Sequence, residues 1–152
     1  MAELVQQAQA AGLVPTISHE RLSGYPLGGG CDRLSILQRI AALPCTPKIL
    51  FVIREQNSWL YSAWKQTIID GGSIGLRDFL TSPGLPSVRL PAPRLEYCDY
   101  AHDIALLHDM FGKANVLVIP MEMLRHGFAR FTAMLEQFAG LEPGRISLQA
   151  LP

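Results

Sequence analysis

The sequence has little charge, few lysines and no long apolar run. Charged residues make up 17% of its 152 residues, below the roughly 25% of an average domain, and 13 Lys+Arg balance 13 Asp+Glu. Because binding to a nucleic-acid backbone requires a basic face or stripe, this balance argues against a nucleic-acid-binding protein. No stretch reaches the roughly 18–20 apolar residues that a membrane-spanning helix needs, so we expect no membrane span.

Cysteine is also scarce. The sequence contains three cysteines, an odd number at irregular spacing, which argues against a disulfide framework and indicates a reducing compartment. Glu3 stands where a secretory signal would carry Lys or Arg, so we expect a cytoplasmic protein.

Cys98 and His102 lie one helical turn apart, but His108 falls off their shared face. We therefore expect no metal site.

The order of apolar runs predicts an α/β fold. The length and the 49% hydrophobic content predict one domain, 1–152, with one core. The continuous apolar run 48–53 is typical of a parallel strand covered by helices on both faces, and 115–120 predicts a second such strand. A shorter strand is expected over 13–18, at an edge because of its proline. Apolar residues at helical spacing predict helices over 2–11, 33–41, 59–70, 76–80, 96–111 and 122–139.

This alternation predicts a three-layer sandwich around a parallel sheet. Asp32 is expected to cap the helix that follows it. The Pro-rich connector 83–93 is expected to be a surface loop and a candidate lid.

Polar residues that follow the strands are the candidates for a binding site, because ligands of open α/β sheets bind beyond the carboxyl ends of the strands. Arg54 leaves the main strand as a planar cation with five donors, which suits a phosphate. Ser62 follows eight residues later, near a helix start where N–H groups and the dipole favour an anion. The pair forms a candidate phosphate clamp. In the structural alternative, Arg54 pairs with Glu55 or Asp70, and Ser62 is a helix-surface hydroxyl.

At these residues the sequence resembles a known family. The segment KILFVIREQNSWLYSAWKQ is similar to the 3′-phosphate-binding segment of sulfotransferases that use 3′-phosphoadenosine-5′-phosphosulfate (PAPS), with a strand, then Arg, then Ser eight residues later on a helix. ISHERLSG, GGSIGLRDFL and FGKANVLVIPMEML resemble segments of bacterial members in the same order, so the resemblance extends from about Pro15 to Leu141. It implies a P-loop-like sulfotransferase fold that uses PAPS as co-substrate. Arg54 and Ser62 would then bind the 3′-phosphate of the nucleotide.

The resemblance also implies an activity, the transfer of a sulfuryl group to a hydroxyl or amine, as of a carbohydrate or small metabolite. The reaction needs a base for the acceptor's proton. Glu20 and His19 follow the strand expected over 13–18, as the family's acceptor-side residue commonly follows a strand. Both remain candidates, and Glu20 has the alternative of pairing with a neighbour or capping the turn. Glu122 is expected to be structural, a helix-start carboxylate that complements the dipole.

One departure from the family bears on catalysis. The family's first strand ends in a Gly-rich loop with Lys or Arg that wraps the 5′-phosphosulfate. The three lysines, Lys48, Lys65 and Lys113, lie outside any such loop, and the glycines at 28–30 follow no strand. We therefore expect an N-terminally incomplete sulfotransferase domain that lacks the first strand and the phosphosulfate loop. We expect its open sheet edge to cause marginal stability or self-association. The alternatives are a catalytically degenerate domain that binds the nucleotide or another anion, and a purely structural fragment.

Overall fold

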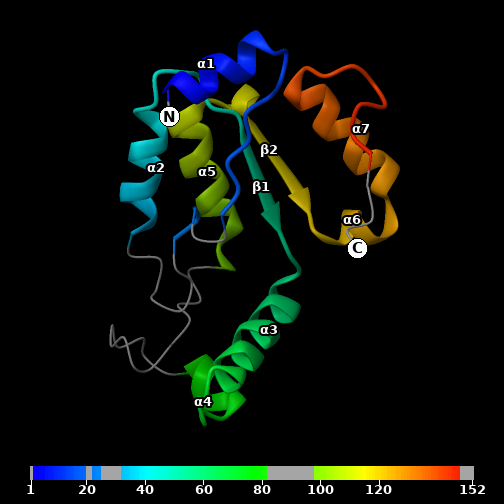
Figure 1. Ribbon diagram of the computed structural model, residues 1–152. Helices are drawn as coiled ribbons and strands as arrows, with labels where there is room; N and C mark the ends of the chain where they lie inside the picture. Colours follow the sequence, from blue (N-terminus) through cyan, green and yellow to red (C-terminus); the bar gives the residue numbers. More distant parts are fainter. Residues whose placement is uncertain (1, 20–21, 25–31, 82–97, 148–152) are drawn as a thin grey trace.

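Two parallel strands form the sheet in the part of the chain that the structure describes. In the computed structural model the described residues are 2–19, 22–24, 32–81 and 98–147. Within them, β1 (Ile49–Ile53) pairs in parallel with β2 (Val116–Pro120), and the register aligns Ile49 with Val116. Both arrows point the same way in Figure 1, so the carboxyl ends of the strands lie at one edge of the sheet.

Helices precede, separate and follow the strands. Their bounds are α1 (Ala2–Ala10), α2 (Arg33–Ala41), α3 (Gln56–Ile69), α4 (Leu76–Thr81), α5 (Tyr100–Phe111), the 3-10 helix η3 (Lys113–Asn115), α6 (Glu122–His126) and α7 (Phe128–Ala139). Figure 1 shows α2 and α5 on one side of the strands and α7 on the other. This arrangement confirms the predicted α/β class with a parallel sheet between helices.

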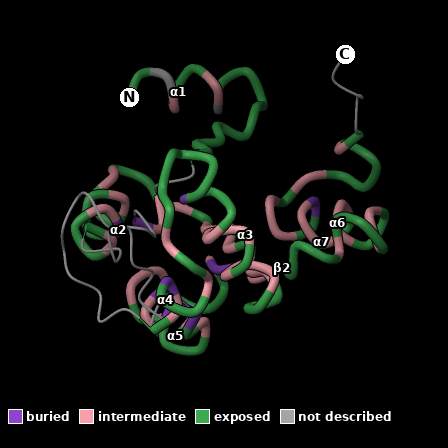
Figure 2. The backbone as a smooth tube through the Cα atoms, turned by 90° about the horizontal axis from the view of Figure 1, so that it is seen from below, coloured by how far each residue is buried: buried purple, intermediate pink, exposed green. Residues whose placement is uncertain are grey.

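One face of the sheet forms the main core. Leu37 of α2, Leu107 of α5 and Val116 of β2 are buried together there. The half-buried residues around them are Ile40, Ile49, Phe51, Leu106, Met110, Phe111 and Val118. Figure 2 shows how short the buried stretches are, because most of the described backbone is exposed or half-buried. The core is therefore small, and one face of the sheet contributes much of it.

The opposite face is covered unevenly. Ile119 of β2 is 0% exposed, and α7 lies beside Leu117 on this face. The β1 side chains there, Leu50 and Val52, are 39% and 44% exposed. The expectation of helices on both faces is thus met for β2 and wrong for β1 within the described residues. The reason is the short connection through α6, which places α7 over β2.

The strand expected over 13–18 is wrong. The segment is extended but pairs with no described strand, and Leu13 and Ile17 are 64% and 58% exposed. Its apolar, β-branched residues have strand propensity, but propensity depends on a neighbour that supplies hydrogen bonds and burial. The ladder of β1 joins β2 alone among the described elements.

Three helix boundaries and one cap also differ from expectation. Helix α3 begins at Gln56, three residues before the expected start at 59. The single helix expected over 122–139 is wrong, because the backbone leaves helical values at Gly127 (φ −150°, ψ 42°) and separates α6 from α7. Helix α5 begins at Tyr100, where the Asp99 side chain accepts a hydrogen bond from the N–H of His102. Asp32 stands before α2 as expected, but its side chain makes no capping hydrogen bond.

Candidate functional site

The carboxyl end of β1 brings the two predicted phosphate ligands together. Arg54 directly follows β1, and Ser62 lies in the second turn of α3. The Arg54 Nη1 atom donates a hydrogen bond to Ser62 Oγ at 3.0 Å, and both residues are half-buried. Local geometry explains the pairing, because the strand, a two-residue turn and the helix form one continuous unit.

The ion pairs of the structural alternative do not form among the described residues. The Glu55 carboxylate instead caps α3, accepting hydrogen bonds from the N–H groups of Asn57 and Ser58 at 2.9 and 2.6 Å. These bonds lower the pKa of Glu55, the Ser58 contacts most. Asp70 accepts a hydrogen bond from the Gln66 side chain at 2.8 Å. Both carboxylates are engaged within α3, and the guanidinium contacts Ser62.

The turn after β1 is held by the second strand–helix junction. The N–H of Met121 donates to the carbonyl of Ile53 at 2.7 Å, which extends the strand pairing by one bond. The N–H of Glu55 donates to Glu122 Oε1 at 3.0 Å. That bond, followed by the N–H of Glu122 itself, lowers the pKa of the Glu122 carboxyl. Glu122 thus lies in the first turn of α6, as predicted, and its carboxylate also binds the backbone of the turn that follows β1.

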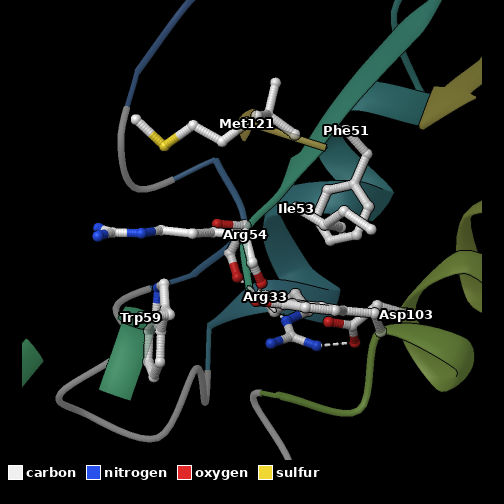
Figure 3. Close-up of a pocket in the computed structure, with 10 residues that line it drawn as sticks. Arg33, Phe51, Ile53, Arg54, Trp59, Asp103 and Met121 are labelled. Atoms are coloured by element: carbon white, nitrogen blue, oxygen red, sulfur yellow. Dashed lines mark hydrogen bonds and ion pairs between the residues drawn. The ribbon is translucent and has the colours of Figure 1, made fainter. Parts of the chain in front are cut away.

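A pocket of about 230 Å³ opens at this edge of the sheet. Its lining residues are Ser23, Arg33, Phe51, Val52, Ile53, Arg54, Trp59, Tyr100, Asp103 and Met121. In Figure 3 the Arg54 side chain extends on the same side as Trp59, and the Arg33–Asp103 pair lies on the other side of the strand end. The pocket therefore presents two cationic side chains in different directions.

The Arg33–Asp103 ion pair is a feature that the sequence analysis missed. It joins α2 to α5, and its side chains are 17% and 8% exposed. Arg33 Nε also donates to the carbonyl of Ser23 at 3.0 Å. Burial raises the pKa of Asp103, and the Arg33 guanidinium opposes that shift. A signal existed, because Asp103 precedes Leu107 by one helical turn on the apolar face of α5 and a carboxylate there needs a partner.

The candidate bases are only partly described. His19 ends the extended segment after α1 and is exposed. Glu20 lies outside the described residues, as do the glycines at 28–30 and the candidate lid at 83–93. The choice between Glu20 and His19 stays a prediction.

Two of the three lysines lie before the strands, and the third lies in α3. Lys48 precedes β1, and its Nζ atom donates a hydrogen bond to the carbonyl of Phe138 in α7. The same Nζ atom lies 5.1 Å from the centroid of the Phe138 ring. Lys65 of α3 lies 5.7 Å from the Tyr61 ring centroid, and Lys113 lies in η3, before β2. Lys48 and Lys113 are thus at the opposite end of the strands from Arg54, whereas Lys65 lies on α3 three residues after Ser62.

The described part of the chain shows neither a cluster of metal ligands nor a membrane-spanning helix. No three His, Cys, Asp or Glu side chains cluster there in a way that suits a metal ion. None of its helices has the length and apolar character required to cross a membrane.

Comparison with known proteins supports the fold. The chain is similar to the crystal structure of a sulfotransferase from Alicyclobacillus acidocaldarius, with a TM-score of 0.58 and 21% sequence identity. The match covers 76% of this chain and 50% of that chain, so this chain spans about half the length of the solved protein. No protein-family model matches the sequence, and no curated protein matches it. The likeness shows that the chain has the α/β fold of a sulfotransferase.

Proposed function

We propose that this chain is part of a PAPS-dependent sulfotransferase, and that Arg54 and Ser62 bind the 3′-phosphate of the nucleotide. The observation that carries the proposal is the 3.0 Å hydrogen bond between Arg54 Nη1 and Ser62 Oγ at the carboxyl end of β1. It occurs in a chain whose fold matches that of a solved sulfotransferase. Ligands of open α/β sheets collect at this edge.

The hydrogen-bond inventory of the pair suits a phosphate. A guanidinium has five N–H donors, and among the described residues Arg54 uses one of them, on Ser62. Ser62 Oγ accepts that bond, which leaves its own O–H to donate to a second acceptor. An oxyanion beside the pair would thus receive a charge-assisted bond from Arg54 and a neutral bond from Ser62. Ser62 lies close to the amino end of α3, where the dipole adds a favourable term.

The proposed reaction is transfer of the sulfuryl group. The acceptor oxygen or nitrogen attacks sulfur, the bond from sulfur to the bridging oxygen of the 5′-phosphate breaks, and that oxygen keeps the electron pair. The proton of the acceptor passes to a base, for which Glu20 and His19 are the candidates. The acceptor is a hydroxyl or amine of a carbohydrate or small metabolite. No metal takes part in this scheme.

The lysine positions favour a second candidate, a domain that binds the 3′-phosphorylated nucleotide without transferring sulfate. Charge that develops on the bridging oxygen needs preorganised donors, and losing one such donor costs about 10²–10³ in rate. Lys48 precedes β1 and Lys113 precedes β2, at the opposite end of the strands from Arg54, and the Lys65 Nζ atom lies near the Tyr61 ring of α3. In the enzyme, donors other than Lys48 and Lys113 would have to supply that stabilisation.

A ligand comparison tests the proposal. Isothermal calorimetry on the chain would compare adenosine 3′,5′-bisphosphate with adenosine 5′-monophosphate, which lacks only the 3′-phosphate. We expect the bisphosphate to bind about 10- to 150-fold more tightly, because a hydrogen bond to a charged group is worth about 1.5–3 kcal/mol. Equal affinity for the two nucleotides would contradict the proposal. A transfer assay with radiolabelled PAPS, on the chain and on a version carrying a Gly-rich Lys loop upstream, then separates enzyme from binding domain.

A further inference from the structure

A single peptide unit, the one between Arg54 and Glu55, is bound at both of its polar groups by side chains from distant elements. The Tyr100 hydroxyl donates to the carbonyl oxygen of Arg54 at 2.8 Å. The N–H of Glu55 donates to Glu122 Oε1 at 3.0 Å. Tyr100 is the first residue of α5, and Glu122 is the first residue of α6. Both reach the turn that carries the proposed phosphate ligand.

The two bonds restrict the orientation of that peptide plane. The carbonyl and the N–H of one peptide unit point in opposite directions within a rigid plane. Rotation of the plane about the axis that joins the two Cα atoms would therefore break both bonds. The direction of the Arg54 side chain depends on the planes on either side of its Cα atom. The preceding plane is held as well, since the carbonyl of Ile53 accepts a hydrogen bond from the N–H of Met121.

The two side chains are themselves fixed in position and protonation state. The Tyr100 ring meets the Phe51 ring edge to face, with centroids 6.4 Å apart and planes at 79°. Burial raises the pKa of Tyr100, so its hydroxyl remains a donor at neutral pH. The N–H of Glu55 lowers the pKa of Glu122, so its carboxylate remains a charged acceptor. Each side chain thus matches the peptide group that it contacts.

We propose that Tyr100 and Glu122 are positioning residues, which lock the Arg54–Glu55 peptide plane and so aim the Arg54 guanidinium at Ser62 and at the bound phosphate. The part that concerns the phosphate rests on the proposed function. The peptide lock itself exists without ligand and is testable without one. The lock also reaches α3, because the Glu55 side chain caps that helix and Ser62 lies on it. Both proposed ligands therefore depend on the same plane.

The experiment uses three variants and a matched control. Tyr100→Phe removes one hydroxyl and keeps the ring against Phe51. Glu122→Ala removes the acceptor, whereas Glu122→Gln keeps an oxygen at the same position. Glu142→Ala, at an exposed carboxylate after α7, is the control. Circular dichroism melts establish that each variant is folded.

One measurement reports on whether the Arg54–Glu55 peptide is held by its hydrogen bonds, and a second reports on nucleotide affinity. Hydrogen exchange of the Glu55 amide, followed by NMR, should be roughly tenfold faster in Glu122→Ala and close to the original rate in Glu122→Gln. The dissociation constant for adenosine 3′,5′-bisphosphate should rise by roughly 3- to 30-fold in Glu122→Ala and Tyr100→Phe. Rescue by Glu122→Gln is expected in both measurements. A purely structural role would shift the melting temperature and leave the dissociation constant unchanged.

The outcomes are distinguishable. Unchanged Glu55 exchange in Glu122→Ala would overturn the lock, and faster exchange with an unchanged dissociation constant would overturn its positioning role. If the unaltered chain binds no bisphosphate, the proposed function fails on its own. Positioning is then decided by the Arg54 Nε–H resonance, which should move in Tyr100→Phe and Glu122→Ala but not in Glu142→Ala. A resonance that stays in place in all of them would overturn the proposal.

Discussion

Replacement of Arg54 by alanine is the most direct test of the phosphate site. The substitution removes the guanidinium that donates to Ser62 Oγ at 3.0 Å and keeps the backbone carbonyl to which the Tyr100 hydroxyl donates. Each charge-assisted hydrogen bond to phosphate is worth about 1.5–3 kcal/mol. Arg54→Ala should therefore raise the dissociation constant for adenosine 3′,5′-bisphosphate by about 10- to 150-fold, at 1.4 kcal/mol for each factor of ten.

Two further variants separate charge from geometry. Arg54→Lys keeps a positive charge but loses the planar fork of donors, so its affinity should fall between those of the unaltered chain and Arg54→Ala. Ser62→Ala removes one neutral hydrogen bond worth about 0.5–1.5 kcal/mol, which corresponds to a two- to tenfold loss. Arg130→Ala, an exposed arginine of α7, is the matched control and should bind as the unaltered chain does.

The assay is calorimetry with the bisphosphate and with adenosine 5′-monophosphate, at one fixed salt concentration because the contact is ionic. Arg54→Ala should lose affinity for the bisphosphate and keep that for the monophosphate. The preference for the 3′-phosphorylated nucleotide should then disappear. Equal losses for both nucleotides would mean that Arg54 supports the turn rather than the phosphate. Unchanged affinity for the bisphosphate would remove Arg54 from the site.

Three more predictions follow from other parts of the chain. In a version that transfers sulfate, Glu20→Gln should lower turnover by roughly 10²–10⁴ at nearly constant nucleotide affinity, and loss of turnover in His19→Gln instead would assign the base to His19. The N–H groups of the loop 144–146 lower the pKa of Glu136. The stability that this contact gives should be complete above the unfolded carboxyl pKa of about 4.3 and lost as pH falls through the lower folded value. Urea unfolding between pH 7 and 3 should show a decline that Glu136→Gln diminishes, and an identical pH dependence would disprove the link. Val52→Lys places a charge on the uncovered face of β1, where Val52 is 44% exposed. Sedimentation should show weaker self-association in that variant, and equal association would exclude this face.

The fold class and the contact between Arg54 and Ser62 were predictable because their signals are local. A continuous apolar run identifies each strand in the sequence, and Arg54 and Ser62 are eight residues apart within one strand–turn–helix unit. Once β1 and α3 form, the spacing alone brings the two side chains to the same end of the sheet. The fold class follows from the order of the same runs along the chain.

The supports of that site were not predictable, because they depend on long-range register. Tyr100 is 46 residues from Arg54, and Glu122 is 67 residues from Glu55. Their contacts require β2 to pair with β1 in one alignment, which places the start of α6 beside the turn after β1. The same dependence explains the error at 13–18, where strand propensity met no pairing partner among the described strands. Sequence reasoning identified Glu122 as structural and had no means of naming the peptide group that it binds.

The geometry suggests that the proposed nucleotide binding and the proposed sulfuryl transfer are separable. The groups proposed to bind the 3′-phosphate come from one rigid unit, and the peptide between Arg54 and Glu55 is held by two more elements, so the binding half is preorganised. Transfer requires donors around the bridging oxygen of the 5′-phosphate. The lysines instead contact aromatic rings of α3 and α7 or lie in η3. The groups proposed to bind the 3′-phosphate can therefore be preorganised while the proposed transfer still depends on donors other than Lys48 and Lys113.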